Sequence, residues 1–143
     1  MWNENVQSVF VRRHFEIMPQ TGTPATATGI VTLYFTPIDF ESFNNVNLVR
    51  LPFSGSDAFG KARLIIEKRD GVSNNNTGLP QSYSGSVTNI NPDDNNIVWN
   101  PTAIRWEVSF AVTGFGGFFV KTQMGALPLR LISFTAKEND WTF

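Results

Sequence analysis

The longest regular alternation of apolar and polar residues in the chain runs from Ile104 to Val112. Its apolar positions are Ile104, Trp106, Val108, Phe110 and Val112, and its other positions are Arg105, Glu107, Ser109 and Ala111. Successive side chains of a β-strand point to opposite faces, so the pattern predicts a strand over 103–112 with one buried face. Thr113-Gly114 reads as a turn, and the aromatic run 115–121 predicts a second strand that pairs with the first as a hairpin.

Shorter apolar runs predict further strands along the chain. They cover 6–18, 28–36, 61–70, 82–90, 97–99 and 129–136. The segment 28–36 is apolar on both faces, which favours a central place in its sheet. One segment predicts a helix, about 37–45. Thr36-Pro37 resembles a helix start, Asp39 suits the third helical position, and Phe40 and Phe43 fall on one face.

About eight strands and one short helix predict an all-β fold, a β-sandwich with Greek-key connections. A length of 143 residues suits one domain. We expect the sandwich to span 1–126. Residues 127–143 are expected to form a final strand and a linker toward a following module.

Composition narrows the function classes. The chain has no cysteine, which excludes disulfides and thiolate metal sites. Lys and Arg number 11 and Asp and Glu 12, so no basic surface for nucleic acid is expected. No apolar run approaches the length of a membrane-spanning helix, so no transmembrane segment is expected.

Two pairs of segments carry a family resemblance. They are VFVRRHFEIMP with TATGIVTLYFT, and IRWEVSFAVTGFGGFFV followed by LPLRLISFTAKEN. Together they resemble a β domain near the carboxyl end of large secreted proteins of Gram-negative bacteria that use type IX secretion. In that family, the pattern matched by 106–119 closes a β domain, and the pattern matched by 127–137 leads toward immunoglobulin-like modules and a sorting signal. The resemblance implies a secreted, extracellular or outer-cell-surface location, and the family supplies no catalytic residues to carry over.

Catalytic motifs are not evident in the sequence. His14 is the only histidine, and no G-x-S-x-G elbow is present to pair with it. The carboxylates that could pair for glycoside hydrolysis are Glu16, Glu67, Asp93, Asp94 and Glu107. Glu107 lies on the polar face of its strand beside Arg105, and exposed strand charges usually serve solubility and cross-strand pairing. We therefore expect a protein that is not an enzyme.

Four aromatic residues fall outside clean alternation, namely Trp2, Tyr83, Trp99 and Trp141, and two of them suggest a sugar-binding surface. Trp99 beside Asn100, together with Tyr83 and Asp94, offers a ring face for stacking and polar groups for hydroxyls. Packing of a large side chain at a sheet edge explains Trp99 equally well.

The turn 91–96 offers a candidate calcium site. Asn91, Asp93, Asp94 and Asn96 carry the hard oxygen atoms that calcium prefers. The spacing is not that of an EF-hand loop, and Asx-rich turns commonly bind their own backbone instead. Calcium is the one cofactor candidate, and no other cofactor is expected.

The sequence thus predicts a non-catalytic structural or assembly module of a secreted or cell-surface bacterial protein. Its expected partners are neighbouring domains of the same protein, or further copies that associate through sheet edges. The alternative is a carbohydrate-binding module of an extracellular polymer-degrading protein, with a polysaccharide as partner.

Overall fold

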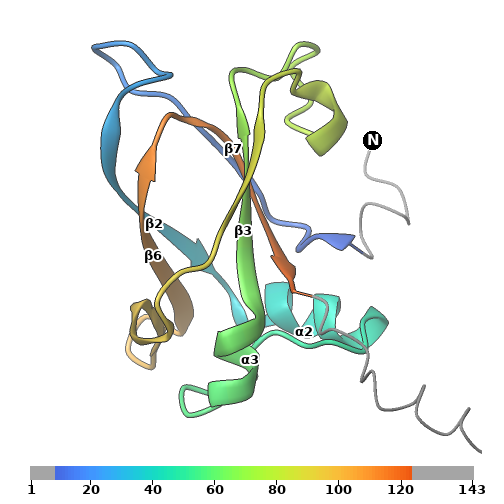
Figure 1. The fold of residues 1–143 in the computed structure, drawn as a ribbon. Helices are drawn as coiled ribbons and strands as arrows, with labels where there is room; N and C mark the ends of the chain where they lie inside the picture. The colour runs from blue at the N-terminus through green and yellow to red at the C-terminus, as the bar shows by residue number, and fades with distance from the viewer. Residues whose placement is uncertain (1–8, 124–143) are drawn as a thin grey trace, which may run out of the picture.

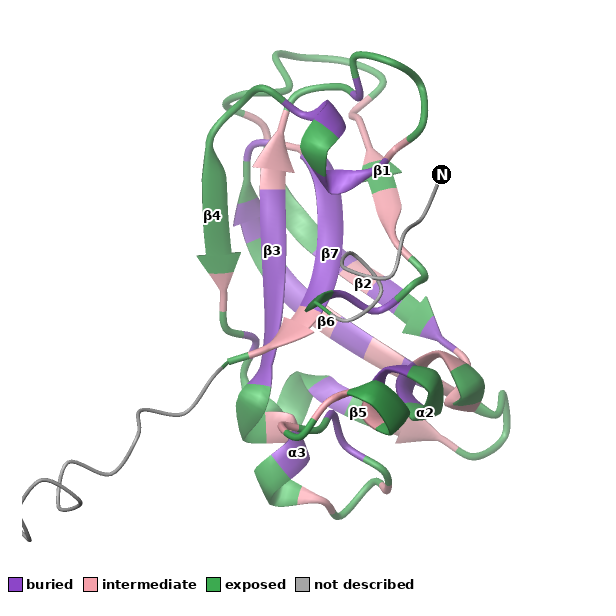
Figure 2. Cartoon of the chain, turned by 90° about the vertical axis from the view of Figure 1, so that its right-hand side faces the viewer, coloured by how far each residue is buried: buried purple, intermediate pink, exposed green. Residues whose placement is uncertain are grey.

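The computed structural model describes residues 9–123, which form two packed antiparallel sheets (Figures 1 and 2). The four-stranded sheet has the order β1 (Phe15–Ile17), β7 (Gly116–Thr122), β3 (Leu64–Asp70) and β4 (Val87–Ile90). The three-stranded sheet has the order β2 (Thr28–Phe35), β6 (Arg105–Thr113) and β5 (Ile97–Asn100). A mostly β, sandwich-like architecture is therefore confirmed. The predicted strand 129–136 and the domain boundary at 126 lie outside the described residues.

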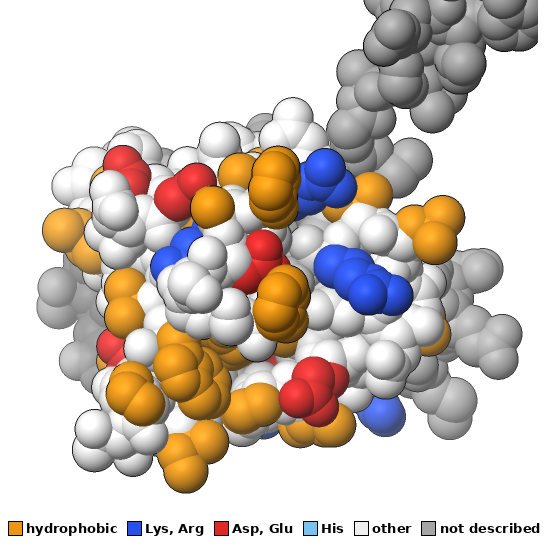
Figure 3. Space-filling model, turned by 90° about the horizontal axis from the view of Figure 1, so that it is seen from below, with side chains coloured by type: hydrophobic (Ala, Val, Ile, Leu, Met, Phe, Trp, Pro, Cys, Tyr) orange, Lys and Arg blue, Asp and Glu red, His pale blue; other side chains and the backbone are white. Residues whose placement is uncertain are grey.

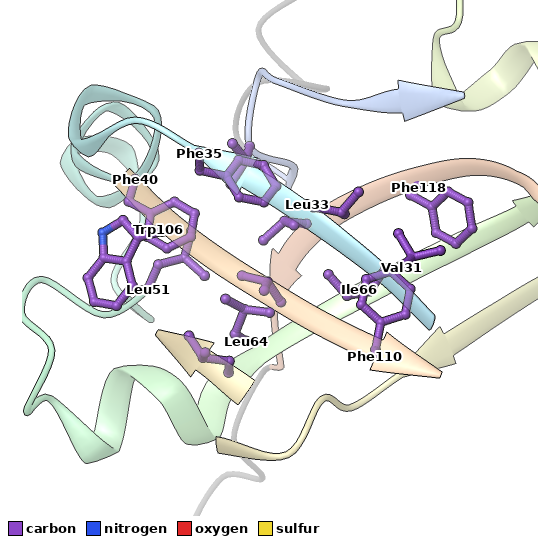
Figure 4. Close-up of a cluster of buried hydrophobic side chains, with 14 of the residues drawn as sticks. Val31, Leu33, Phe35, Phe40, Leu51, Leu64, Ile66, Trp106, Phe110 and Phe118 are labelled. Atoms are coloured by element: carbon purple, nitrogen blue, oxygen red, sulfur yellow. The ribbon is translucent and has the colours of Figure 1, made fainter. Parts of the chain in front are cut away.

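An aromatic core fills the space between the sheets (Figure 4). β2 and β6 pair in an unbroken register from Thr28 opposite Thr113 to Phe35 opposite Trp106. The inner positions of both strands are buried, as the alternation predicts. The facing sheet contributes the buried side chains Leu64, Ile66, Phe118 and Val120.

The four-stranded sheet is covered on both faces, as the purple β3 and β7 in Figure 2 show. On its outer face Phe10 and Tyr83 pack around Phe119 in a separate small cluster. Glu67 is 4 % exposed on this face. It forms ion pairs with Arg69 and Lys121, which satisfy its buried carboxylate.

The predicted hairpin of 103–112 and 115–121 is wrong. β6 lies between β2 and β5, whereas β7 lies between β1 and β3 in the other sheet. The link between them crosses from one layer to the other through Gly114, whose φ is +81°. Gly114 N donates to Ala27 O at 2.8 Å, and Lys68 Nζ donates to Thr113 O at 2.7 Å. Periodicity shows which face of a strand is buried, but not which strand lies beside it.

The predicted helix is present as α2 (Pro37–Val46). Proline occupies its first turn, and the backbone N–H of Thr36 donates to the Asp39 carboxylate at 2.8 Å. These contacts satisfy groups that a helix start leaves free. Phe40 and Phe43 are buried, and the Phe40 ring stacks on Trp106 with centroids 5.5 Å apart.

A second helix, α3 (Ala58–Arg63), occupies the start of the predicted strand 61–70. Asp57 caps it by accepting from Gly60 N at 3.0 Å, and β3 begins only at Leu64. Both helices lie at the same end of the molecule (Figure 1). In residues 9–123, no helix is long and apolar enough to cross a membrane.

Three further strand predictions need correction. Within the described part of 6–18, only Phe15–Ile17 forms a strand. Within the predicted strand 82–90, only Val87–Ile90 forms a strand, and Ser82 belongs to the short 3-10 helix Pro80–Ser82. Among the strands of residues 9–123, β2 lies at the edge of its sheet rather than at its centre. Its inner side chains pack in the core, while Ile30 on its outer face is 80 % exposed.

Candidate functional site

A groove of about 430 Å³ opens at the end of the molecule that carries α2 and α3. Phe40 and Trp106, both almost fully buried, form its inner part. Trp99 lines it from β5, and the exposed Phe53 and Ile104 stand at its rim. Figure 3 views this end and shows hydrophobic side chains gathered on the surface. The groove is thus mainly aromatic and aliphatic.

Trp99 is half-buried because it packs on the core while it lines the groove. It lies opposite Trp106 in the β5–β6 register, and the two rings are 5.5 Å apart. The loop 54–56 comes so close that a Cβ on Gly55 would lie 3.3 Å from the Trp99 Cβ. Trp99 is therefore both a packing residue and part of a partly accessible surface.

Ile104 adopts φ +54°, a left-handed conformation that β-branched residues rarely occupy. Asn100 holds the preceding turn, because its Oδ1 accepts from Thr102 N at 3.1 Å and from Ala103 N at 2.9 Å. The alternation places Ile104 on the buried face, but the strand begins only at Arg105 and Ile104 is 63 % exposed. Such strained residues concentrate at binding and switch sites.

The polar groups around the groove are mostly used within the protein. The Asn44 amide donates to Leu51 O at 3.0 Å and accepts from Leu51 N at 2.8 Å. Asn100 donates to Glu107 Oε1 at 3.0 Å. Hydrogen bonds from Arg105 and then from Asn100 lower the pKa of Glu107. The groove therefore offers apolar contact more than free hydrogen-bonding groups.

Tyr83 lies away from this groove, in the cluster on the outer face of the four-stranded sheet. Its ring is 7 % exposed and packs edge-on against Phe119. Its hydroxyl donates to Glu16 Oε2 at 2.6 Å. Burial, followed by this hydrogen bond and the Glu16 charge, raises the pKa of Tyr83 strongly. The structure therefore does not bring Tyr83 and Trp99 together, and the Tyr83 ring is not open for stacking.

The Asn- and Asp-rich turn is exposed and is organised by its own backbone. Asp93 Oδ1 accepts from Asn95 N at 2.8 Å and caps the short 3-10 helix Asp94–Asn96. Asp94 does not line the groove of Trp99, and Asn91 lies before the 3-10 helix. In the part of the chain that is described, no three His, Asp or Glu side chains gather as metal ligands. Calcium binding through Asn91, Asp93, Asp94 and Asn96 stays a prediction.

His14 packs beside the same outer cluster as Tyr83. Its ring stacks on Phe119 at 5.5 Å with an interplanar angle of 18°, and its Nδ1 lies 2.9 Å from Arg12 O. Sequence reasoning missed the groove because its residues come from three separate segments. The local signal for the groove was Trp99, which falls outside clean alternation.

Comparison with known proteins found no relative. No family model matches the sequence, no curated protein matches it, and no solved structure matches it. The function is therefore argued from the motif resemblance and from the geometry of the described residues.

Proposed function

We propose that this chain is a non-catalytic structural or assembly module of a larger secreted or cell-surface bacterial protein. Its contact surface is the apolar end, which we define as the exposed side chains around α2, α3 and the groove. They are Ile38, Val46, Leu48, Phe53, Phe59 and Ile104. The single observation that carries the proposal is the exposure of large apolar side chains there, with Phe53 and Phe59 each 80 % exposed. Gathered apolar surface of this kind marks interaction sites.

The course of the chain supports a neighbouring module as the partner. Gln123 N donates to Arg63 O in α3 at 2.8 Å, and Thr122 Oγ1 donates to Val49 O at 3.3 Å. Gln123, the last described residue, therefore lies beside the apolar end. The family resemblance supports secretion and a following module.

We further propose Greek-key connections for the sandwich. The chain changes sheet between β1 and β2, between β2 and β3, between β4 and β5, and between β6 and β7. Such repeated crossing of layers is typical of Greek-key sandwiches.

Hydrogen exchange tests the apolar end. The chain of 143 residues is compared with a longer protein that carries its natural downstream sequence. We expect new amide protection over 46–59 and 100–104 and unchanged exchange over 91–96. A Phe59→Ser change should weaken this protection, whereas Val72→Ser should not, although Val72 is also exposed. Unchanged exchange at the apolar end, or a gene that encodes nothing downstream, would refute the proposal.

A second candidate function is carbohydrate binding, because Trp99 and Phe53 line one groove. Tryptophan fluorescence is followed during titration with soluble polysaccharides. This function requires a saturable change that Phe53→Ala abolishes and Phe59→Ala preserves. The absence of any change at millimolar ligand would rule it out and leave the assembly role in place.

A further inference from the structure

We propose that β2 pairs edge to edge with β2 of a second copy of this chain. Within residues 9–123, β2 pairs with β6 alone, so its other edge has no strand beside it. It has eight residues, whereas the edge strands β1, β4 and β5 have three, four and four. β2 is therefore the longest edge that the described sheets offer.

The hydrogen-bonding pattern shows which backbone groups point outward. Ala27 O accepts from Gly114 N at 2.8 Å, which makes residue 27 and residue 114 a hydrogen-bonded pair. In an antiparallel ladder such pairs alternate with non-bonded ones. When this alternation is continued along the β2–β6 register, four residues of β2 point their backbone N–H and C=O groups away from β6. They are Thr28, Ile30, Thr32 and Tyr34.

β2 lacks the features that protect edge strands from pairing. Its sequence, TGIVTLYF, contains no charged residue and no proline. Its register with β6 runs through eight consecutive pairs, so no bulge turns the edge away. Ile30 is 80 % exposed and Tyr34 is 45 % exposed, with the Arg105 guanidinium 3.9 Å from the Tyr34 ring centroid. This edge combines unused backbone groups with apolar surface.

A second copy fits because the edge is self-complementary. When two β2 strands run antiparallel with Val31 opposite Val31, Thr28 faces Tyr34 and Ile30 faces Thr32. Every outward-pointing residue then meets an outward-pointing residue of the other copy, and side chains keep to matching faces. The strands are uncharged, so the two copies bring no like charges together. The two three-stranded sheets would join into one continuous sheet.

This inference deepens the proposed assembly role and rests on it, but the two can fail separately. β2 lies in the three-stranded sheet, and the apolar end does not include it. A chain that stays monomeric yet gains protection at the apolar end from its downstream sequence would refute only the β2 pairing.

Sedimentation velocity of the full chain, from about 10 µM to about 1 mM, tests the pairing. We expect a monomer–dimer equilibrium. Ile30→Lys should raise the dissociation constant at least about tenfold, because each dimer then carries two ammonium groups at the joined edge. The matched control is Val98→Lys, which adds the same charge at the opposite edge of the same sheet, on β5, where Val98 is 44 % exposed. It should change the constant less than about twofold.

Amide exchange measured by NMR gives a second readout that does not depend on any variant. The amides of Thr28, Ile30, Thr32 and Tyr34 should exchange fast in the monomer and slowly in the dimer. The intervening amides of β2 should be protected in both states. A monomer at the highest concentration, dissociation by Val98→Lys instead of Ile30→Lys, or four amides already protected in the monomer would each overturn the proposal.

Discussion

Lys68→Met should destabilise the protein because the Lys68 side chain connects its two sheets through a hydrogen bond. Its side chain is 6 % exposed at the end of β3. Nζ donates to Thr113 O at 2.7 Å, where the chain passes from β6 to β7, and forms an ion pair with Asp70 at 2.7 Å. Methionine fills similar space but donates no hydrogen bond, so Thr113 O loses its charged partner.

The expected loss follows from these contacts. A hydrogen bond from a charged donor contributes about 1.5–3 kcal/mol, and Lys68 Nζ also donates to the buried Gly114 O at 3.4 Å, which loses its donor as well. The Asp70 side chain is 39 % exposed overall, but its Oδ1, which meets Lys68 Nζ, is buried, so Lys68→Met also removes the counter-charge of that oxygen. We expect the free energy of unfolding to fall by about 2–3 kcal/mol.

Urea denaturation followed by tryptophan fluorescence measures this loss. For a slope of about 1–3 kcal/mol per molar, the midpoint should fall by about 0.7–3 M. Lys61→Met on α3 is the matched control and should change stability by less than about 0.5 kcal/mol. Amide exchange of Gly114, which donates to Ala27 O, should accelerate in Lys68→Met. If Lys68→Met and Lys61→Met change the free energy of unfolding by the same amount, Lys68 does not connect the two sheets.

Three further changes have expected outcomes. Phe40→Ala should lower the free energy of unfolding by about 3–5 kcal/mol in the same urea assay, because Phe40 is 2 % exposed and stacks on Trp106. A loss below about 1 kcal/mol would argue against the packing of Phe40 in the core between the sheets. Ile104→Gly should raise stability by about 1 kcal/mol by relieving the positive φ, and a decrease would contradict the strain. Phenolate absorbance of the folded protein should lag that of the unfolded protein at alkaline pH, because the pKa of Tyr83 is raised in the fold. The fold favours the neutral hydroxyl of Tyr83. Its contribution to the free energy of unfolding is therefore present below the ordinary tyrosine pKa and is lost as pH rises above it. Tyr83→Phe should remove the lag in phenolate absorbance, and a lag that persists would show another cause.

The candidate surface shows the limit of sequence reasoning most clearly. Trp99 falls outside the strand alternation, and it lines a groove, while its role in ligand binding stays a prediction. Tyr83 was grouped with it, yet the fold buries Tyr83 against Phe119 and Glu16. No local pattern could separate these two residues, because the burial of each depends on segments distant in sequence.

By itself the sequence determined the helix α2 and the buried faces of the longer strands. Alternation places Trp106, Val108 and Phe110 in the core, and the Pro37 and Asp39 signals place α2, because these features depend on neighbouring residues alone. The tertiary structure decided which strands are neighbours. It separated β6 from β7, left β2 at an edge, and gathered the groove from three segments. A strand's periodicity fixes only the direction of its side chains, whereas its partners are chosen by how the two layers pack as a whole.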